Sequence, residues 1–273
     1  MIPRLWPVNM ALIPVNLKSA SLLMTCAALT VTGCAPSGTE ADKDTPYLAT
    51  SMGYARTPEV VDAVVNADGS LRLTGLAMPQ GRVRLVATDG RAIGVTADAR
   101  GRFMADVPQG EGGSLYTLAM ENEGRLIKAD GTVFVPPQTA ATDDPGAVYL
   151  REGAASLPLS ARSGLLATLD YDAGGGMAVS GRSLPDVVIE VAVDGQTAAR
   201  TRTDAVGLYH ALIPPGNRGI GSRVQLSVRG ANNTETRSAM LKAPQSDRIE
   251  ADDGLWYIHR SLLGGGSQTT VVF

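Results

Sequence analysis

The residue types that most often carry out chemistry in proteins are scarce in this chain. Its 273 residues include two histidines, His210 and His259, and two cysteines, Cys26 and Cys34. Hydrolysis by a Ser-His-Asp arrangement would have to use one of the histidines. The glycine-flanked serine of many hydrolases is missing, because Gly181-Arg-Ser183-Leu-Pro185 lacks the last glycine. We therefore predict no catalytic residues, with a surface hydrolase that uses His210 or His259 as the alternative.

Metal binding is predicted to be absent as well. Zinc sites need clustered cysteines and histidines, which this sequence does not offer. Three acidic segments weakly resemble calcium loops, which need several oxygen ligands close together: Asp170–Gly174, Asn66–Gly69 and Asp252-Asp253. The loop that begins at Asp170 has Gly181 where an EF-hand has its last glutamate. Aspartate beside glycine is more often a turn former, so we predict neither a metal nor a cofactor and keep calcium as a minor alternative.

One cysteine stands where its thiol could be modified. Residues 19–33 form an uncharged, mostly apolar run that follows Lys18 and ends in Val31-Thr32-Gly33-Cys34. The run has the length of the apolar part of a signal peptide, and it is too short for a transmembrane helix of about 20 residues. Cys26 lies inside the run and would be removed with it. We therefore expect no disulfide in the processed chain.

The end of this run resembles the lipobox of bacterial lipoproteins, in which an aliphatic residue and two small residues precede a cysteine. The resemblance implies that a signal peptidase recognises Val31, Thr32 and Gly33, and that cleavage frees Cys34 for acylation and membrane anchoring. Ala35, rather than aspartate, implies sorting to the outer membrane, with the protein periplasmic or surface-exposed. An uncleaved anchor or an ordinary signal peptide are the alternatives, and translation could start at Met10.

The charge pattern argues against one class of partner. The formal net charge is −3, and no run of lysine or arginine occurs. A protein that grips nucleic acid by its phosphates needs such a basic surface, so we predict no nucleic-acid partner. After the predicted signal peptide (1–33), residues 34–57 begin with the lipidated cysteine and the small, polar stretch APSGTEADKDTP, which is typical of a flexible tether.

The rest of the chain contains an internal repeat. Residues 70–110 align without a gap to 176–216, at a constant offset of 106 positions. Nine positions are identical in the two copies: Gly75/Gly181, Pro79/Pro185, Ala92/Ala198, Asp98/Asp204, Ala99/Ala205, Gly101/Gly207, Ala105/Ala211, Pro108/Pro214 and Gly110/Gly216. The sequence is therefore a tandem of one module.

Each copy alternates apolar and polar residues as half-buried strands do. In 187–194 the residues Val187, Ile189, Val191 and Val193 share one face, and an Asp-Gly hairpin signal follows. Short strands recur throughout, without a clear helical period. We predict an all-β fold with two antiparallel β-sandwich domains at 58–135 and 147–273, joined by a linker at 136–146.

The repeated turn resembles a known module. The pattern T-D-A-x-G-x-[FY] at 203–209, followed by Pro214 and Gly216, resembles bacterial Ig-like and carboxypeptidase-regulatory-like (transthyretin-like) domains. The first copy departs from it with Ala97 in place of the threonine. The resemblance implies sandwiches with a spacer, adhesion or binding role; it implies no catalysis and assigns no site residues.

The densest aromatic residues lie near residue 257. By alternation, Tyr257 and His259 share one face of a predicted strand at 255–262, and we consider them a possible ligand contact, with a sugar or a protein stacking on the tyrosine. The sequence thus favours a lipid-anchored, non-catalytic binding or scaffold module. We predict that its partner is another envelope or secreted protein and that it assists secretion, adhesion or nutrient acquisition, with a carbohydrate-binding role as the other alternative.

Overall fold

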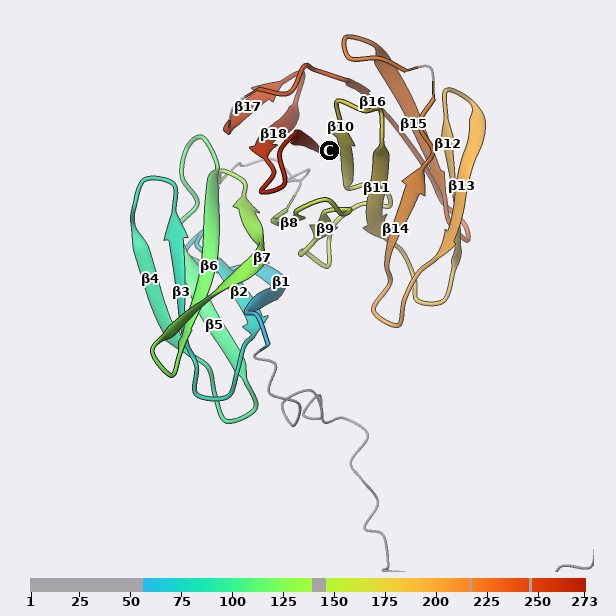
Figure 1. Ribbon diagram of the computed structural model, residues 1–273. Helices are drawn as coiled ribbons and strands as arrows, with labels where there is room; N and C mark the ends of the chain where they lie inside the picture. The colour runs from blue at the N-terminus through green and yellow to red at the C-terminus, as the bar shows by residue number, and fades with distance from the viewer. Residues whose placement is uncertain (1–55, 139–145, 217, 246) are drawn as a thin grey trace, which may run out of the picture. The chain divides into compact units, whose positions relative to one another are not determined.

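The structure is a computed structural model that describes residues 56–138, 146–216, 218–245 and 247–273. These residues form β-strands and turns without a helix, and therefore include no helix able to cross a membrane. All of them belong to one compact unit. The prediction of an all-β fold built of antiparallel Ig-like sandwiches is confirmed (Figure 1). The signal peptide and most of the tether and linker predictions lie outside the described residues.

The first sandwich pairs a sheet of order β1-β2-β5 with a sheet of order β4-β3-β6-β7-β8-β9. Apolar residues alternate inward along these strands, and they meet in a core that includes Leu73, Leu85, Phe103 and Met120. The strands of this sandwich are β1 (Glu59–Val65), β2 (Leu71–Leu76), β3 (Arg82–Ala87), β4 (Ala92–Thr96), β5 (Arg102–Val107), β6 (Ser114–Asn122), β7 (Arg125–Val135), β8 (Val148–Arg151) and β9 (Leu157–Pro158).

The second sandwich pairs a sheet of order β14-β11-β10-β19-β18-β17 with a sheet of order β13-β12-β15-β16. Its core includes Leu169, Ile189, Tyr209 and Leu226. The strands are β10 (Thr168–Asp172), β11 (Met177–Arg182), β12 (Val188–Val193), β13 (Gln196–Arg202), β14 (Leu208–Ile213), β15 (Arg223–Arg229), β16 (Thr234–Met240), β17 (Arg248–Asp252), β18 (Leu255–Ser261) and β19 (Ser267–Val272).

The repeated turn has one geometry in both copies. Asp98 Oδ1 accepts hydrogen bonds from the backbone N–H groups of Arg100 and Arg102, each at 2.8 Å. Asp204 Oδ1 accepts the two equivalent bonds at 2.9 Å. The glycine of the motif takes a positive φ, +78° at Gly101 and +79° at Gly207, which favours glycine. The motif is therefore a turn that the aspartate and the glycine fix together.

One strand lies in a different sheet from the one we expected. The segment 147–151 was predicted within the second sandwich, but β8 pairs with β7 of the first. The reason is that β8 is buried on both faces. Tyr149 packs into the core of the first sandwich, whereas Val148 and Leu150 join a separate apolar cluster with Ile258 and Val272 of the second. An alternation pattern cannot assign a strand that has apolar cover on both sides.

Candidate functional site

The densest set of buried polar groups surrounds Asp170, on the face of β10 that points away from the core of the second sandwich. Its carboxylate is 3% exposed. Oδ2 accepts a hydrogen bond from the backbone N–H of Ser156 at 2.6 Å, and Oδ1 accepts from the Ser156 hydroxyl at 2.7 Å. Oδ1 also accepts from the Thr270 hydroxyl at 2.6 Å and from Gln268 Nε2 at 3.2 Å. Burial nevertheless raises the pKa of Asp170, because desolvation outweighs these bonds.

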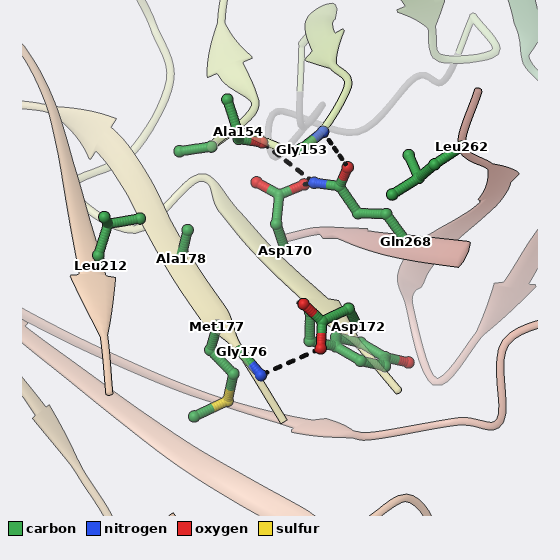
Figure 2. Close-up of a pocket in the computed structure, with 12 residues that line it drawn as sticks. Gly153, Ala154, Asp170, Asp172, Gly176, Met177, Ala178, Leu212, Leu262 and Gln268 are labelled. Carbon is green, nitrogen blue, oxygen red and sulfur yellow. Dashed lines mark hydrogen bonds between the residues drawn. The ribbon is translucent and has the colours of Figure 1, made fainter. Parts of the chain in front are cut away.

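Gln268 fastens a loop onto this cluster. Its Nε2 donates to the carbonyl of Ala154 at 3.0 Å, and its Oε1 accepts from the N–H of Gly153 at 3.2 Å. The side chain therefore satisfies two backbone groups of the loop between β8 and β9 while it also contacts Asp170 (Figure 2). Together with Ser156, it holds the loop against β10 and β19.

Arg260 supplies the cationic part of the cluster. The side chain of this β18 residue donates from Nη2 to the carbonyl of Arg151 and to the Thr270 hydroxyl, each at 3.3 Å. Thr270 thereby lies between the guanidinium and Asp170. Burial lowers the pKa of Arg260, and the negative charge of Asp170 opposes that shift. Its Nε is buried and has no hydrogen-bond partner among the described residues.

A small open cavity lies beside Asp170 and Gln268. Its volume is about 170 Å³, and its remaining wall is mainly apolar, including Met177, Ala178 and Leu212 (Figure 2). The carboxylate at its edge already accepts four hydrogen bonds. Asp170 is therefore not free to act as a general base. The cluster can hold the loop between β8 and β9 in place, and the cavity beside it can admit a small chemical group.

The two residues predicted as a ligand contact are buried. Tyr257 is 1% exposed and His259 is 0% exposed. The ring of Tyr257 lies under the ammonium group of Lys242, 4.2 Å from the ring centroid, and its hydroxyl accepts from the N–H of Met240 at 3.2 Å. The alternation that placed Tyr257 and His259 on one face agrees with this geometry, but that face points inward. A ligand could stack on Tyr257 only if Lys242 and its neighbours moved away.

His259 occupies an unusual environment. Its Nδ1 lies 2.9 Å from the Thr269 hydroxyl, and its Nε2 has no hydrogen-bond partner among the described residues. Burial lowers its pKa; the nearby carboxylate of Glu250 acts in the opposite direction, while Arg248 and Lys242 add to the lowering. The imidazole is therefore held neutral near neutral pH.

The two histidines of the hydrolase alternative do not meet. His210 is exposed on β14, and His259 is on β18 of the same sheet, with β11, β10 and β19 between these strands. Four strand spacings separate them by about 19 Å. A single Ser-His-Asp site could use only one of them.

The aspartates of the segments that resembled calcium loops bind other groups of the protein. Asp68 Oδ1 accepts from the N–H and the hydroxyl of Ser70, at 2.9 and 2.7 Å. Asp172 Oδ1 accepts a hydrogen bond from the N–H of Gly176 at 3.1 Å (Figure 2). Asp252 is paired with Lys242 at 2.8 Å. Within the described ranges, no three histidine, cysteine or acidic residues are grouped closely enough to hold a metal ion.

Cys34 and the residues that precede it, Val31, Thr32 and Gly33, lie outside the described residues, so the lipidation site stays a prediction. The cluster around Asp170 was not predicted. Its members include Thr168 and Asp170 on β10 and Gln268 and Thr270 on β19, and all four of these polar residues are buried.

Comparison with known proteins adds the following. No protein-family model matches the chain, and no curated protein matches it. Among solved structures, one similar chain is the central fibronectin-III array of RIM-binding protein, with 12% identity and a TM-score of 0.27, covering 74% of this chain and 79% of that one. Another is the BSP domain of a biofilm-associated protein, with 11% identity and a TM-score of 0.23, covering 70% of this chain and 30% of that one.

Proposed function

We propose that this chain is a bacterial lipoprotein, anchored in the outer membrane through acyl chains on Cys34, that acts as a non-catalytic binding or scaffold module at the cell envelope. The observation that carries the anchor is the sequence Val31-Thr32-Gly33-Cys34 at the end of an uncharged apolar run. Several acyl chains, each contributing about 0.8 kcal/mol per buried CH₂, would hold the protein at the bilayer.

The use of the buried polar groups supports a non-catalytic role. Asp170 is engaged by four hydrogen bonds, and His259 is enclosed by its sheet. These two groups, which could otherwise do acid–base chemistry, are thus committed to holding strands and a loop in place. A binding or scaffold module needs such a rigid frame more than it needs reactive groups, and its partner would be another envelope or secreted protein.

The anchor can be tested by metabolic labelling. Cells that express the full chain are fed an alkyne-tagged fatty acid, and the purified protein is examined by gel fluorescence and by mass spectrometry of its N-terminal peptide. Acylation at Cys34 is expected in the native chain, because the thiol of that residue is the predicted acceptor. Cys34→Ser should remove the label and leave the signal peptide uncleaved.

Cys26→Ser is the matched control, since it changes the other cysteine and should keep the label. An N-terminal peptide that begins elsewhere than Cys34, or a Cys34 that carries no acyl group in the native chain, would contradict the proposed anchor.

A further inference from the structure

The exposed edge of the first sandwich is open to pairing with another strand. The edge strand β4 has the sequence Ala-Ile-Gly-Val-Thr and contains no charged residue. It pairs only with β3 in its sheet and lies at the border of that sheet (Figure 1). Uncharged edges are uncommon in soluble proteins because they invite pairing with other chains.

The hydrogen-bond pattern shows which backbone groups of β4 are available. Ala97 N–H donates to Gly81 O at 2.9 Å, and Ala87 N–H donates to Arg91 O at 2.8 Å. In the antiparallel register between β3 and β4, every second pair exchanges such bonds, so Ile93 and Val95 bond to β3. The N–H and C=O groups of Ala92, Gly94 and Thr96 therefore point outward, away from the sheet.

The second copy of the module protects the same edge. Gly94 and Thr96 correspond to Arg200 and Arg202 on β13, at the repeat offset of 106. Arg200 pairs with Glu190 at 2.6 Å, and Arg202 pairs with Asp186 at 3.1 Å. The pairing of β12 with β13 also contains a register shift between Val191 and Ala192, whereas the pairing of β3 with β4 is regular. Charges and bulges are the devices that block edge strands, and β4 has neither.

The packing of the sandwich does not require glycine at position 94. A Cβ built there would meet no atom within 4 Å, and its φ is not positive. Glycine in a strand interior is destabilising relative to residues with side chains, and it marks places where another backbone approaches closely. The space beside Gly94, in the middle of the exposed strand β4, is therefore not filled by any side chain of the described residues.

The positive charge of Arg84, opposite Gly94 in the sheet, indicates which kind of strand would pair with β4. Arg84 on β3 lies between Gly94 and Ala119 in the sheet register, and it makes no ion pair with any described residue. Its counterpart in the second copy is Glu190, which lies between Arg200 and Arg229 and pairs with both at 2.6 Å. In the first copy, the two positions opposite Arg84 are Gly94 and Ala119, so neither offers a charged side chain to pair with it. A strand added beside β4 would bring a side chain opposite Gly94, within reach of the long Arg84 side chain across two strand spacings of about 5 Å each.

We propose that β4 accepts an extended, acidic segment of a partner protein as an added antiparallel strand, with a glutamate or aspartate opposite Gly94 facing Arg84. Main-chain bonds to Ala92, Gly94 and Thr96 provide the affinity, and the pair with Arg84 and the neighbouring Arg82 provides the selection for acidic residues. A second copy of this chain fits less well, because it would bring further arginines to the same face. The proposal refines the binding role above by naming the surface and the partner's chemistry.

The test uses a fluorescent peptide, TVEVEVT, in which both glutamates lie on one face of an extended strand, and its counterpart with lysines in their place. Fluorescence anisotropy is measured with the full chain in detergent. Saturable binding of the acidic peptide is expected.

Three variants test which groups bind the peptide. Gly94→Arg, which copies the arginine of the second repeat, should weaken peptide binding about tenfold or more. Arg84→Glu should weaken it by about threefold or more and shift the preference to the lysine peptide. Arg200→Gly, on the protected edge, should leave it unchanged.

Hydrogen exchange locates the contact. On binding, the amides of Ala92, Gly94 and Thr96 should gain protection, while those of Ile93 and Val95, already bonded to β3, should change little. Gly94→Pro removes an outward N–H without removing a bond to β3, so it should abolish the effect in a chain that stays folded.

Four results would overturn the proposal: no saturable binding, equal binding by Gly94→Pro, outward amides already protected in the free chain, or a dimer of the chain that Gly94→Pro dissolves. None of these results depends on acylation of Cys34, so the failure of this proposal and the failure of the proposed anchor are distinguishable.

Discussion

His259 is a residue whose burial ties stability to pH. Its Nε2 is buried without a partner, and Lys242, Arg248 and Glu250 are the charged groups that affect it. Because burial lowers its pKa in the folded state, the unfolded chain binds a proton first as the pH falls through about 6.5. Above about pH 6.5, His259 is neutral in both states and does not change the free energy of unfolding. As the pH falls from about 6.5 toward the lowered pKa of the folded state, protonation of the unfolded chain progressively reduces the free energy of unfolding.

We expect the free energy of unfolding, measured in urea, to fall between pH 7.5 and pH 5 more steeply in the native chain than in His259→Gln. The difference in slope isolates the imidazole from the carboxylates that titrate in the same range. His210→Gln is the control, because it makes the same substitution at the exposed histidine. Equal slopes for all three proteins would contradict this explanation.

At the scale of the strand and loop, a single glutamine connects two parts of the chain. Gln268 on β19 bonds to Ala154 and Gly153 and to Asp170. Gln268→Ala removes these bonds and should speed amide exchange in residues 153–156 by about tenfold, with about 1–2 kcal/mol lost from the free energy of unfolding.

Gln225→Ala is the matched control for this prediction, since Gln225 is exposed on β15 and should change neither quantity. Unchanged exchange at residues 153–156 in Gln268→Ala would show that the other bonds of the loop, such as the one from Arg151 Nε to the carbonyl of Ala155, hold it without Gln268.

The strands also show how far the sequence could predict the structure. Alternation and the Asp-Gly turn predicted β12 and β13 well, because β12 alternates buried residues with more exposed ones and Gly195 permits the hairpin turn that leads into β13. β17 was missed, since its sequence, Arg-Ile-Glu-Ala-Asp, is mostly charged and is a strand because it pairs with β18. The cluster around Asp170 could not be predicted, because its members become buried only when the loop between β8 and β9 covers them.

In the molecule as a whole, an apolar cluster joins residues of both sandwiches. Phe134 on β7 is fully buried, and its ring centroid lies 5.9 Å from that of Trp256 on β18, at an angle of 47°. Ile258 and Val272 complete the contact. Tilted aromatic pairs contribute about 0.5–1.5 kcal/mol beyond the area that they bury.

A double-mutant cycle tests whether this cluster couples the two sandwiches. Phe134→Ala and Trp256→Ala should show an interaction energy of about 0.5–1.5 kcal/mol in the free energy of unfolding. Phe103→Ala, in the core of the first sandwich, should combine additively with Trp256→Ala. Additive effects of the first pair would mean that the rings touch without stabilising each other.

The position of β19 has a consequence for how the protein is made. β19 lies between β10 and β18, inside its sheet, and Thr168 on β10 pairs with Val272 about a hundred positions later. Contacts between residues so distant in sequence form late and slowly. Until residues 267–272 have joined the sheet, it is divided at its middle and has two additional unpaired strand edges. Proteases and chaperones would meet that incompletely folded form, and a chain truncated before β19 would stay in it.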